Sequence, residues 1–288
     1  MRLEVEELHI GFPGPRGLVP AVRGVSFAMR AEKVGIVGES GSGKSLTARA
    51  ILRLTPPAAV VRARRLLFDG VDLAAASPRA LGAIRGRRVG LVLQDPKFAL
   101  NPVMTAGEQI AEPLRLHKGL SRRQARAAAV DLLAQVLIRD PGRIAGHYPH
   151  ELSGGMGQRV MIAMMLAADP ELLIADEPTS ALDATVQAEI LRLIETLVSR
   201  RGMGLILISH DLPLVSHFCD RILVMYAGRV VEALSAAELT KSRHPYTQGL
   251  LACLPSLKRP RPRLPVLARD QAWAAAQAPE AAQAWGAA

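Results

Sequence analysis

The sequence predicts an α/β fold, with a mostly parallel sheet, an antiparallel β subdomain and an inserted α-helical lobe. Short apolar runs typical of buried strands alternate with helical segments over most of the chain, as in doubly wound folds. One block, at about residues 97–168, keeps helical periodicity without a strand signal. With 288 residues, 49% of them hydrophobic and 22% charged, the chain is long enough to bury a core of this kind.

The first 54 residues predict three strands and one helix. The strands Arg2–Ile10 and Ala21–Met29 are separated by Gly11–Pro20, a Gly- and Pro-rich stretch that we expect to be a turn region. The apolar run Val34–Val37 predicts a buried strand, and Leu46–Leu54 predicts the helix that follows it after a glycine-rich turn.

Further strands are predicted at Arg64–Phe68 and at Val89–Leu93, and the inserted helical lobe follows them. Arg62, Arg64 and Arg65 form a basic cluster that could contact phosphate, although a solvated strand edge is the favoured interpretation. Strands and helices then alternate again, and a hairpin turning at Ala227-Gly228 ends the series. In order, these are the strand Leu172–Ala175, the helix Thr185–Val198, the strand Gly204–Ile208, the helix Leu212–Cys219 and the hairpin strands Arg221–Tyr226 and Arg229–Glu232.

The composition changes sharply after Leu254, where residues 258–263 read KRPRPR and the last residues are rich in Ala and Gln. We therefore expect one folded domain over residues 1–254, with its helical lobe at about 97–168. Residues 255–288 are expected to form a C-terminal extension that is flexible or loosely docked.

The net charge of +10 could suit nucleic acid or an anionic membrane surface. Because no basic stripe interleaved with aromatic residues is present, we favour charges spread over solvated faces and expect no nucleic-acid partner. Cys219 and Cys253 lack metal-ligand spacing and are expected to be buried free thiols of a reducing compartment. No apolar run approaches the ~20 residues that span a bilayer, and the strand-like start is not a signal peptide. A cytosolic chain is expected.

The turn between the third strand and the first helix reads GESGSGKS, which matches G-x-x-x-x-G-K-[ST] in its expected context. Glycines there let successive backbone N–H groups face a phosphate at the positive end of a helix. The alternative is a chance glycine turn, which the downstream motifs argue against. Lys44 can reach the β- and γ-phosphates, and the Ser45 hydroxyl can ligate Mg²⁺. The nucleotide-binding residues predicted here are Gly38, Glu39, Ser40, Gly41, Ser42, Gly43, Lys44, Ser45 and Leu46.

Polar side chains follow two of the predicted buried strands. Asp176 and Glu177 come after Leu172–Ala175, where Asp176 would hold the metal through water and Glu177 would deprotonate the attacking water. Gln94 follows another strand, and its amide could ligate Mg²⁺ or position water. Taken alone, a strand that simply ends in such a polar pair is common, and a glutamine at a strand end is more often just exposed. The order of the motifs along the chain favours catalytic roles for Gln94 and Glu177.

Two single residues are weaker candidates. His210 follows the strand Gly204–Ile208 and could bond the γ-phosphate and Glu177, although a lone histidine is usually structural. Phe12 precedes the phosphate loop in a chain with only 3% aromatic residues, and its ring could stack on adenine or simply pack near a turn.

The combined motifs resemble the ATP-binding subunit of an ABC transporter over roughly residues 1–254. They are GESGSGKS, Gln94, LSGG at 152–155, LLIADEP at 172–178, SALD at 180–183 and Ser209-His210-Asp211. The resemblance implies a phosphate-loop NTPase core with ATP and Mg²⁺ as cofactors. It also implies that two subunits sandwich two ATP molecules. The residues acting across that interface would be Ser153, Gly154, Gly155 and Asp183.

Three features resemble the importer branch for dipeptides, oligopeptides and nickel: GESGSGKS, GEQIAEPL at 107–114 and HPYT at 244–247. The implied partners are a second ATPase chain, expected to differ from this one, two integral membrane permease subunits and an extracytoplasmic binding protein. That assembly would place the chain on the cytoplasmic side of the cell membrane. Gly157 departs from the arginine typical of the branch, at a local helix cost of up to ~1 kcal/mol. Many peptide-branch members carry a cysteine cluster after HPYT that holds an iron–sulfur centre, whereas this chain has only Cys253 in that region. The lack of this cysteine cluster slightly favours import of a metal or metal chelate.

The sequence leaves several functions open. Peptide, nickel and metal-chelate cargoes are not separated, because the membrane and extracytoplasmic partners select the cargo. Related ATPases serve as accessory subunits of a soluble phosphonate-cleaving complex, which the catalytic motifs do not distinguish from a transporter. A nucleic-acid-linked ATPase is a third alternative, but no long heptad repeat is present to form its arm.

Overall fold

The structure is a computed structural model of the chain that describes residues 1–180, 182–254, 267, 270 and 273. It divides into two compact units, one formed by Met1–Ala76 with Leu207–Ala288 and the other by Ser77–Ile206. The expectation of a flexible or loosely docked extension at residues 255–288 falls, except for 267, 270 and 273, outside the described residues.

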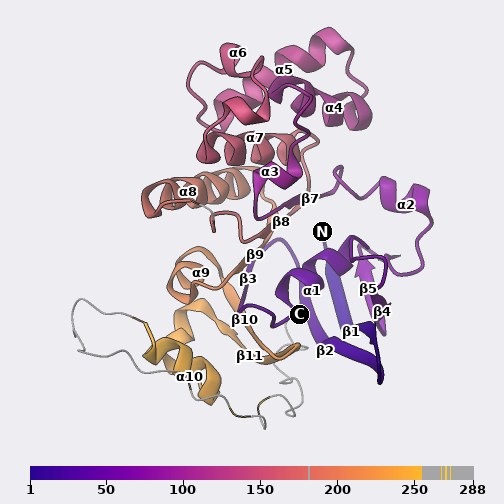
Figure 1. Cartoon of the computed structure of the whole chain (residues 1–288), viewed down its shortest axis with the longest axis vertical. Coiled ribbons are helices and arrows are strands. Elements are labelled where there is room, and N and C mark those ends of the chain that lie inside the picture. Colours follow the sequence, from indigo (N-terminus) through magenta and orange to yellow (C-terminus); the bar gives the residue numbers. More distant parts are fainter. Residues whose placement is uncertain (181, 255–266, 268–269, 271–272, 274–288) are drawn as a thin grey trace. The chain divides into compact units, whose positions relative to one another are not determined.

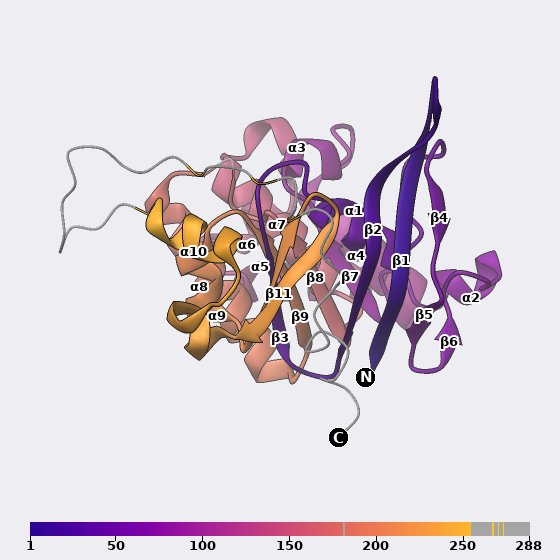
Figure 2. The same ribbon diagram turned by 90° about the horizontal axis from the view of Figure 1, so that it is seen from below.

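The first unit contains an antiparallel sheet with the strand order β2-β1-β5-β6, in which β4 also pairs with β1. Figure 2 shows the long hairpin of β1 and β2 in indigo, with β4 and β5 beside β1. Alternate residues of these strands are buried, so one apolar face forms part of the core. The strands are β1 (Leu3–Gly14), β2 (Gly17–Met29), β4 (Val60–Arg62), β5 (Arg65–Phe68) and β6 (Val71–Asp72).

The prediction that Gly11–Pro20 forms a turn region is wrong, because β1 and β2 continue through these residues as paired strands. Gly11 lies opposite Pro20, and Gly14 lies opposite Gly17, so only two residues form the turn. Pro20 lies in an edge strand, β2, which is where prolines within sheets are usually tolerated. The short strand β4, which pairs with His9–Gly11, was not predicted either.

The same unit contains the strand before the phosphate loop. This strand, β3 (Lys33–Val37), pairs in parallel with β10 (Arg221–Tyr226), which pairs antiparallel with β11 (Arg229–Ser235). The turn at Ala227-Gly228 has φ values of 46° and 84°, as a tight two-residue hairpin requires, and the predicted hairpin is confirmed. The helices of this unit are α1 (Lys44–Ile51), α9 (Leu212–Phe218), η2 (Ala236–Lys241) and α10 (Pro245–Ala252).

The second unit contains the predicted helical lobe, labelled α4 to α7 in Figure 1. The lobe follows β7 (Val89–Val92) and precedes β8 (Leu172–Asp176), and these two strands pair in parallel. Capping boxes at Thr105 and Ser121 explain where α4 and α5 begin. The helices are α2 (Pro78–Gly82), α3 (Pro96–Ala99), α4 (Ala106–Lys118), α5 (Arg122–Gln135), α6 (Pro141–Ile144), η1 (Pro149–Glu151), α7 (Gly154–Leu166) and α8 (Ala184–Arg201).

The predicted mixed α/β fold, with parallel strand pairs, an antiparallel β part and a helical lobe, is therefore confirmed. The strand β9 (Gly204–Ser209) spans the boundary between the two units. None of the helices among the described residues combines the length and the apolar character needed to traverse a bilayer. Cys219 is buried as expected, whereas Cys253 is half-buried.

Candidate functional site

The phosphate loop connects β3 to α1 within the first unit. Gly38, Gly41 and Gly43 have φ values of 152°, 82° and 96°, which residues other than glycine rarely adopt. A Cβ atom on Gly38 would lie 2.1 Å from the Met225 carbonyl oxygen, and one on Gly43 would lie 2.9 Å from the Ala21 carbonyl oxygen. Glycine is therefore required at both ends of the loop by the neighbouring backbone as well as by the loop's own conformation.

Lys44, the first residue of α1, folds back over this loop. Its side chain is buried, and Nζ donates hydrogen bonds of 2.8 Å to the carbonyl oxygens of Gly38 and Glu39. Ser45 is half-buried, and Gly43 is the N-cap of α1 without a side-chain capping bond. A glycine cradle, an ammonium group and a hydroxyl at a helix start form a donor set that fits a phosphate chain with Mg²⁺.

The predicted carboxylates end β8 within the second unit. Every residue of β8 is buried, and Asp176, its last residue, is 2% exposed. Glu177 follows with a φ of 47°, an uncommon backbone conformation for a residue with a side chain. Gln94 Nε2 donates a hydrogen bond of 3.4 Å to Glu177 Oε2. The structure thus brings together two of the three residues predicted to be catalytic.

The LSGG motif lies at the start of α7. Ser153 is its exposed N-cap, and Oγ accepts a hydrogen bond of 3.3 Å from the Met156 N–H. Gly154 is exposed and Gly155 half-buried, and a Cβ atom on Gly155 would lie 2.8 Å from Val186 Cγ1 of α8. Small residues therefore leave the start of α7 accessible to solvent, and they also allow α7 to pack closely against α8.

Asp183 is the N-cap of α8 and is exposed. Its Oδ1 accepts hydrogen bonds of 3.1 and 3.0 Å from the backbone N–H groups of Thr185 and Val186. The resemblance implied a role for Asp183 across a subunit interface, and its capping role was not predicted. An aspartate that directly precedes an apolar helical pattern was the available signal.

The two weaker candidates lie in the first unit. Phe12 is half-buried in β1 opposite Val19, and His210 is exposed directly after β9. Asp211, the next residue, caps α9 by accepting a hydrogen bond of 2.9 Å from the Leu214 N–H. Their roles toward a nucleotide stay predictions.

One contact to the phosphate loop was not predicted at all. The Tyr246 hydroxyl accepts a hydrogen bond of 3.1 Å from the Glu39 N–H. The two residues are 207 positions apart, so no local pattern could have revealed the contact. HPYT at 244–247 drew attention to Tyr246, but only as a feature of one family branch.

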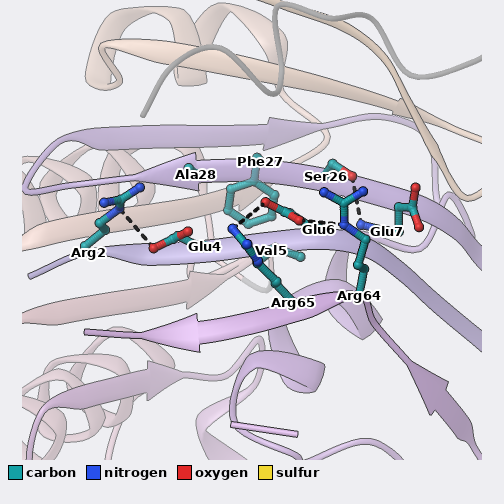
Figure 3. A pocket seen from close by; sticks show the side chains of 10 residues that line it. All are labelled: Arg2, Glu4, Val5, Glu6, Glu7, Ser26, Phe27, Ala28, Arg64 and Arg65. Carbon is teal, nitrogen blue, oxygen red and sulfur yellow. Dashed lines mark hydrogen bonds and ion pairs between the residues drawn. The ribbon is translucent and has the colours of Figure 1, made fainter. Parts of the chain in front are cut away.

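Two members of the basic cluster, Arg64 and Arg65, line a pocket of about 260 Å³ on the antiparallel sheet, shown in Figure 3. Arg64 Nε lies 3.0 Å from Glu6 Oε2, and Arg65 lies 3.4 Å from Glu6 Oε1. Arg2 similarly pairs with Glu4 at 3.0 Å. These arginines pair with carboxylates of the same sheet, which argues against a phosphate site. The expected strand edge does not describe β5, because β5 pairs with β1 on one side and with β6 on the other.

Solved structures define the class of protein. An ATP-binding cassette solved as a dimer in a post-hydrolysis state bound to ADP and Pi matches with a TM-score of 0.72 and 29% identity. The match covers 81% of this chain and 98% of that cassette. Together with the phosphate loop, it assigns this chain to the ATP-binding, ATP-hydrolysing cassettes, which use ATP with Mg²⁺.

Sequence comparisons identify the family. The ABC transporter family profile matches residues 22–180. A probable peptide ABC transporter ATP-binding protein of Sinorhizobium fredii is 48% identical over 267 residues, covering 91% of this chain and 80% of the relative. The oligopeptide transport ATP-binding protein OppD of Bacillus subtilis is 48% identical over 259 residues, covering 89% of this chain and 72% of the relative. The chain belongs to the ABC transporter family, as the resemblance of its motifs implied.

Proposed function

We propose that this chain is one of two paired ATPase subunits that hydrolyse MgATP to drive peptide uptake through membrane partners. The observation that carries the proposal is the complete motif set in a chain 48% identical, over 91% of its length, to a relative named for peptide transport. This similarity supports peptides over nickel or metal chelates as cargo. It likewise supports a transporter over an accessory ATPase of a soluble enzyme complex.

Within the subunit, the phosphate loop binds the triphosphate through its backbone N–H groups and Lys44. Ser45, Gln94 and, through water, Asp176 would hold Mg²⁺, and the ion would supply positive charge that neutralises the charge developing on the phosphates. Glu177 acts as general base toward the attacking water, and Gln94, bonded to it at 3.4 Å, orients that base. His210 bonds the γ-phosphate, and Phe12 stacks on the adenine.

The remaining residues act on the nucleotide of the partner subunit. Ser153 and Gly155 present the start of α7, whose N–H groups and helix dipole stabilise an approaching phosphate. Asp183 lies at the corresponding end of α8. Because Ser153 and Asp183 are both exposed, a second subunit has access to them.

The implied assembly has a second, different ATPase chain, two integral membrane subunits and an extracytoplasmic binding protein, with this chain on the cytoplasmic side. Contact with the membrane subunits through the helical lobe is supported by Phe98 and Val103, at the start of the predicted span 97–168. Phe98 lies in α3 and Val103 before α4, and they are 89% and 78% exposed. Exposed apolar surface gathered in one segment marks an interaction site more than scattered single side chains do, and these two residues lie five positions apart.

The test is transport by the assembled complex in vesicles, with a short peptide and a nickel salt as alternative cargoes. Peptide uptake that requires MgATP and is lost in a complex carrying Glu177→Gln would support the proposal. Nickel uptake without peptide uptake would overturn the cargo assignment. Co-purification with soluble enzyme subunits, in place of integral membrane subunits, would overturn the transport role.

A further inference from the structure

A buried tyrosine outside the predicted site is hydrogen-bonded to the phosphate loop. Tyr246, near the start of α10, is 0% exposed. Its hydroxyl accepts the 3.1 Å hydrogen bond from the Glu39 N–H. A buried tyrosine hydroxyl usually finds a hydrogen-bond partner, and here the partner is the backbone of the phosphate loop itself.

The bonded N–H belongs to the peptide unit that joins Gly38 to Glu39. The C=O of the same unit, on Gly38, accepts a hydrogen bond of 2.8 Å from Lys44 Nζ. In a trans peptide the N–H and C=O bonds lie in the peptide plane and point in opposite directions. The plane is therefore held from one side by Tyr246 and from the other by Lys44, which fixes its rotation.

The Tyr246 ring is itself fixed by its neighbours. It lies 4.6 Å from the Tyr226 ring and 6.0 Å from the Trp273 ring, measured between ring centroids. At the start of α10, His244 Nδ1 accepts a hydrogen bond of 3.2 Å from the Tyr246 N–H. The hydroxyl is consequently presented to the loop by a packed aromatic cluster of Tyr226, His244, Tyr246 and Trp273, and not by a mobile side chain.

We propose that Tyr246 is a positioning residue for ATP binding, whose hydroxyl orients the Gly38–Glu39 peptide and through it the Lys44 ammonium. The inference rests on the proposed ATPase function and adds a residue that acts through the loop. Without the hydroxyl, the peptide plane can rotate, and the Gly38 carbonyl no longer directs Lys44 toward the phosphates. Part of the binding free energy of the nucleotide is then used to order the loop, so the affinity for the nucleotide falls.

Tyr246→Phe removes only the hydroxyl, and Tyr226→Phe is the matched control from the same aromatic cluster. The first measurement is hydrogen exchange of residues 38–46 in the nucleotide-free full chain. We expect about three- to tenfold faster exchange at the Glu39 amide in Tyr246→Phe, as for loss of one hydrogen bond, and no change in Tyr226→Phe. The second is a titration with a non-hydrolysable ATP analogue and Mg²⁺, in which Tyr246→Phe should raise Kd by a similar factor.

Unchanged exchange or an unchanged Kd in Tyr246→Phe would overturn the proposal, as would an equal effect of Tyr226→Phe. A measurement on the parent chain needs no variant, since an unprotected Glu39 amide there would also overturn it. A failure of the proposed ATPase function would give a different result, because the parent chain itself would then not bind the analogue with Mg²⁺. That result would overturn both proposals, whereas normal binding by both the parent chain and Tyr246→Phe would overturn only this one.

Discussion

Gln94 Nε2 donates a hydrogen bond to Glu177 Oε2 over 3.4 Å, and both residues lie two positions beyond the last pair of the β7–β8 register, Val92 and Ala175. Parallel strands end at the same edge of a sheet, so the register itself brings the amide to the carboxylate. The pairing gives Gln94 a definite role toward the proposed general base.

We expect Gln94→Ala to lower kcat about ten- to hundredfold, because a hydrogen bond to a charged group is lost where the base must be oriented. The Mg²⁺ concentration for half-maximal activity should also rise, because the amide is a proposed metal ligand. Steady-state ATPase assays over a Mg²⁺ series measure both effects. Gln135→Ala, a glutamine on α5 in the same unit, is the control. Equal kcat and equal Mg²⁺ dependence in the two variants would remove Gln94 from the site.

The phosphate loop should tolerate no side chain at its first glycine. Gly38→Ala places a Cβ atom 2.1 Å from the Met225 carbonyl oxygen at a φ of 152°, so the loop must move. We expect this variant to bind MgATP about five- to 150-fold more weakly, from strain on the order of 1–3 kcal/mol. Gly142→Ala is the control, since nothing lies within 4 Å of its added Cβ atom. Normal nucleotide affinity in Gly38→Ala would contradict the loop geometry.

Gly157, which departs from the branch pattern, is buried in the first turns of α7. A Cβ atom there would lie 3.4 Å from Pro96 Cβ and Cγ, which is ordinary contact. We therefore expect Gly157→Ala to raise the free energy of unfolding by up to ~1 kcal/mol through helix propensity. Thermal unfolding of the variant and the parent measures the effect. A lower melting temperature would mean that α3 packs against this position too closely for a methyl group.

The spacing of the apolar residues and the residue types at the turns were enough to predict most helices and strands. The hairpin over Ala227-Gly228 and the buried strand before Asp176 follow from local residues, and both are confirmed. Gly11–Pro20 was misread because Gly and Pro usually break strands, whereas here the edge position of β2 accommodates Pro20. Edge position is a property of the assembled sheet and is absent from the local sequence.

The candidate site shows the same division between local and long-range information. The phosphate loop could be located from its motif, since eight consecutive residues carry it. The contact between Tyr246 and Glu39, which are 207 positions apart, depends on how α10 packs beside β10. No periodicity of the sequence predicts such a contact. The capping bonds of Ser153 and Asp183 are local, and the residue types at those helix starts could have predicted them.

His244 should make folding stability depend on pH. Burial lowers the pKa of His244 from 6.5, and the opposing effect of Glu232 is smaller. The unfolded chain then binds the proton more readily than the folded chain, so stability is full above pH 6.5 and falls as the pH drops toward the lowered pKa. Protonation of Nδ1 would also remove the acceptor for the Tyr246 N–H.

We expect the melting temperature to fall less in His244→Asn than in the parent between about pH 7.5 and 5.5, because asparagine can cap a helix without titrating in this range. Thermal unfolding over a pH series measures this difference. His9→Asn, at an exposed position of β1, should retain the pH dependence of the parent. An identical pH dependence in the parent and His244→Asn would show that His244 does not contribute.

The central claim is that this chain hydrolyses ATP with Glu177 as its general base, and ATP turnover by the assembled complex carrying Glu177→Gln tests it most directly. The account predicts that MgATP binding survives, that turnover falls at least about a hundredfold and that an ATP-bound dimer accumulates. Glu238→Gln, at an exposed position of η2, should leave turnover unchanged. Parent-like turnover by Glu177→Gln would contradict the assignment of the base and the mechanism built on it.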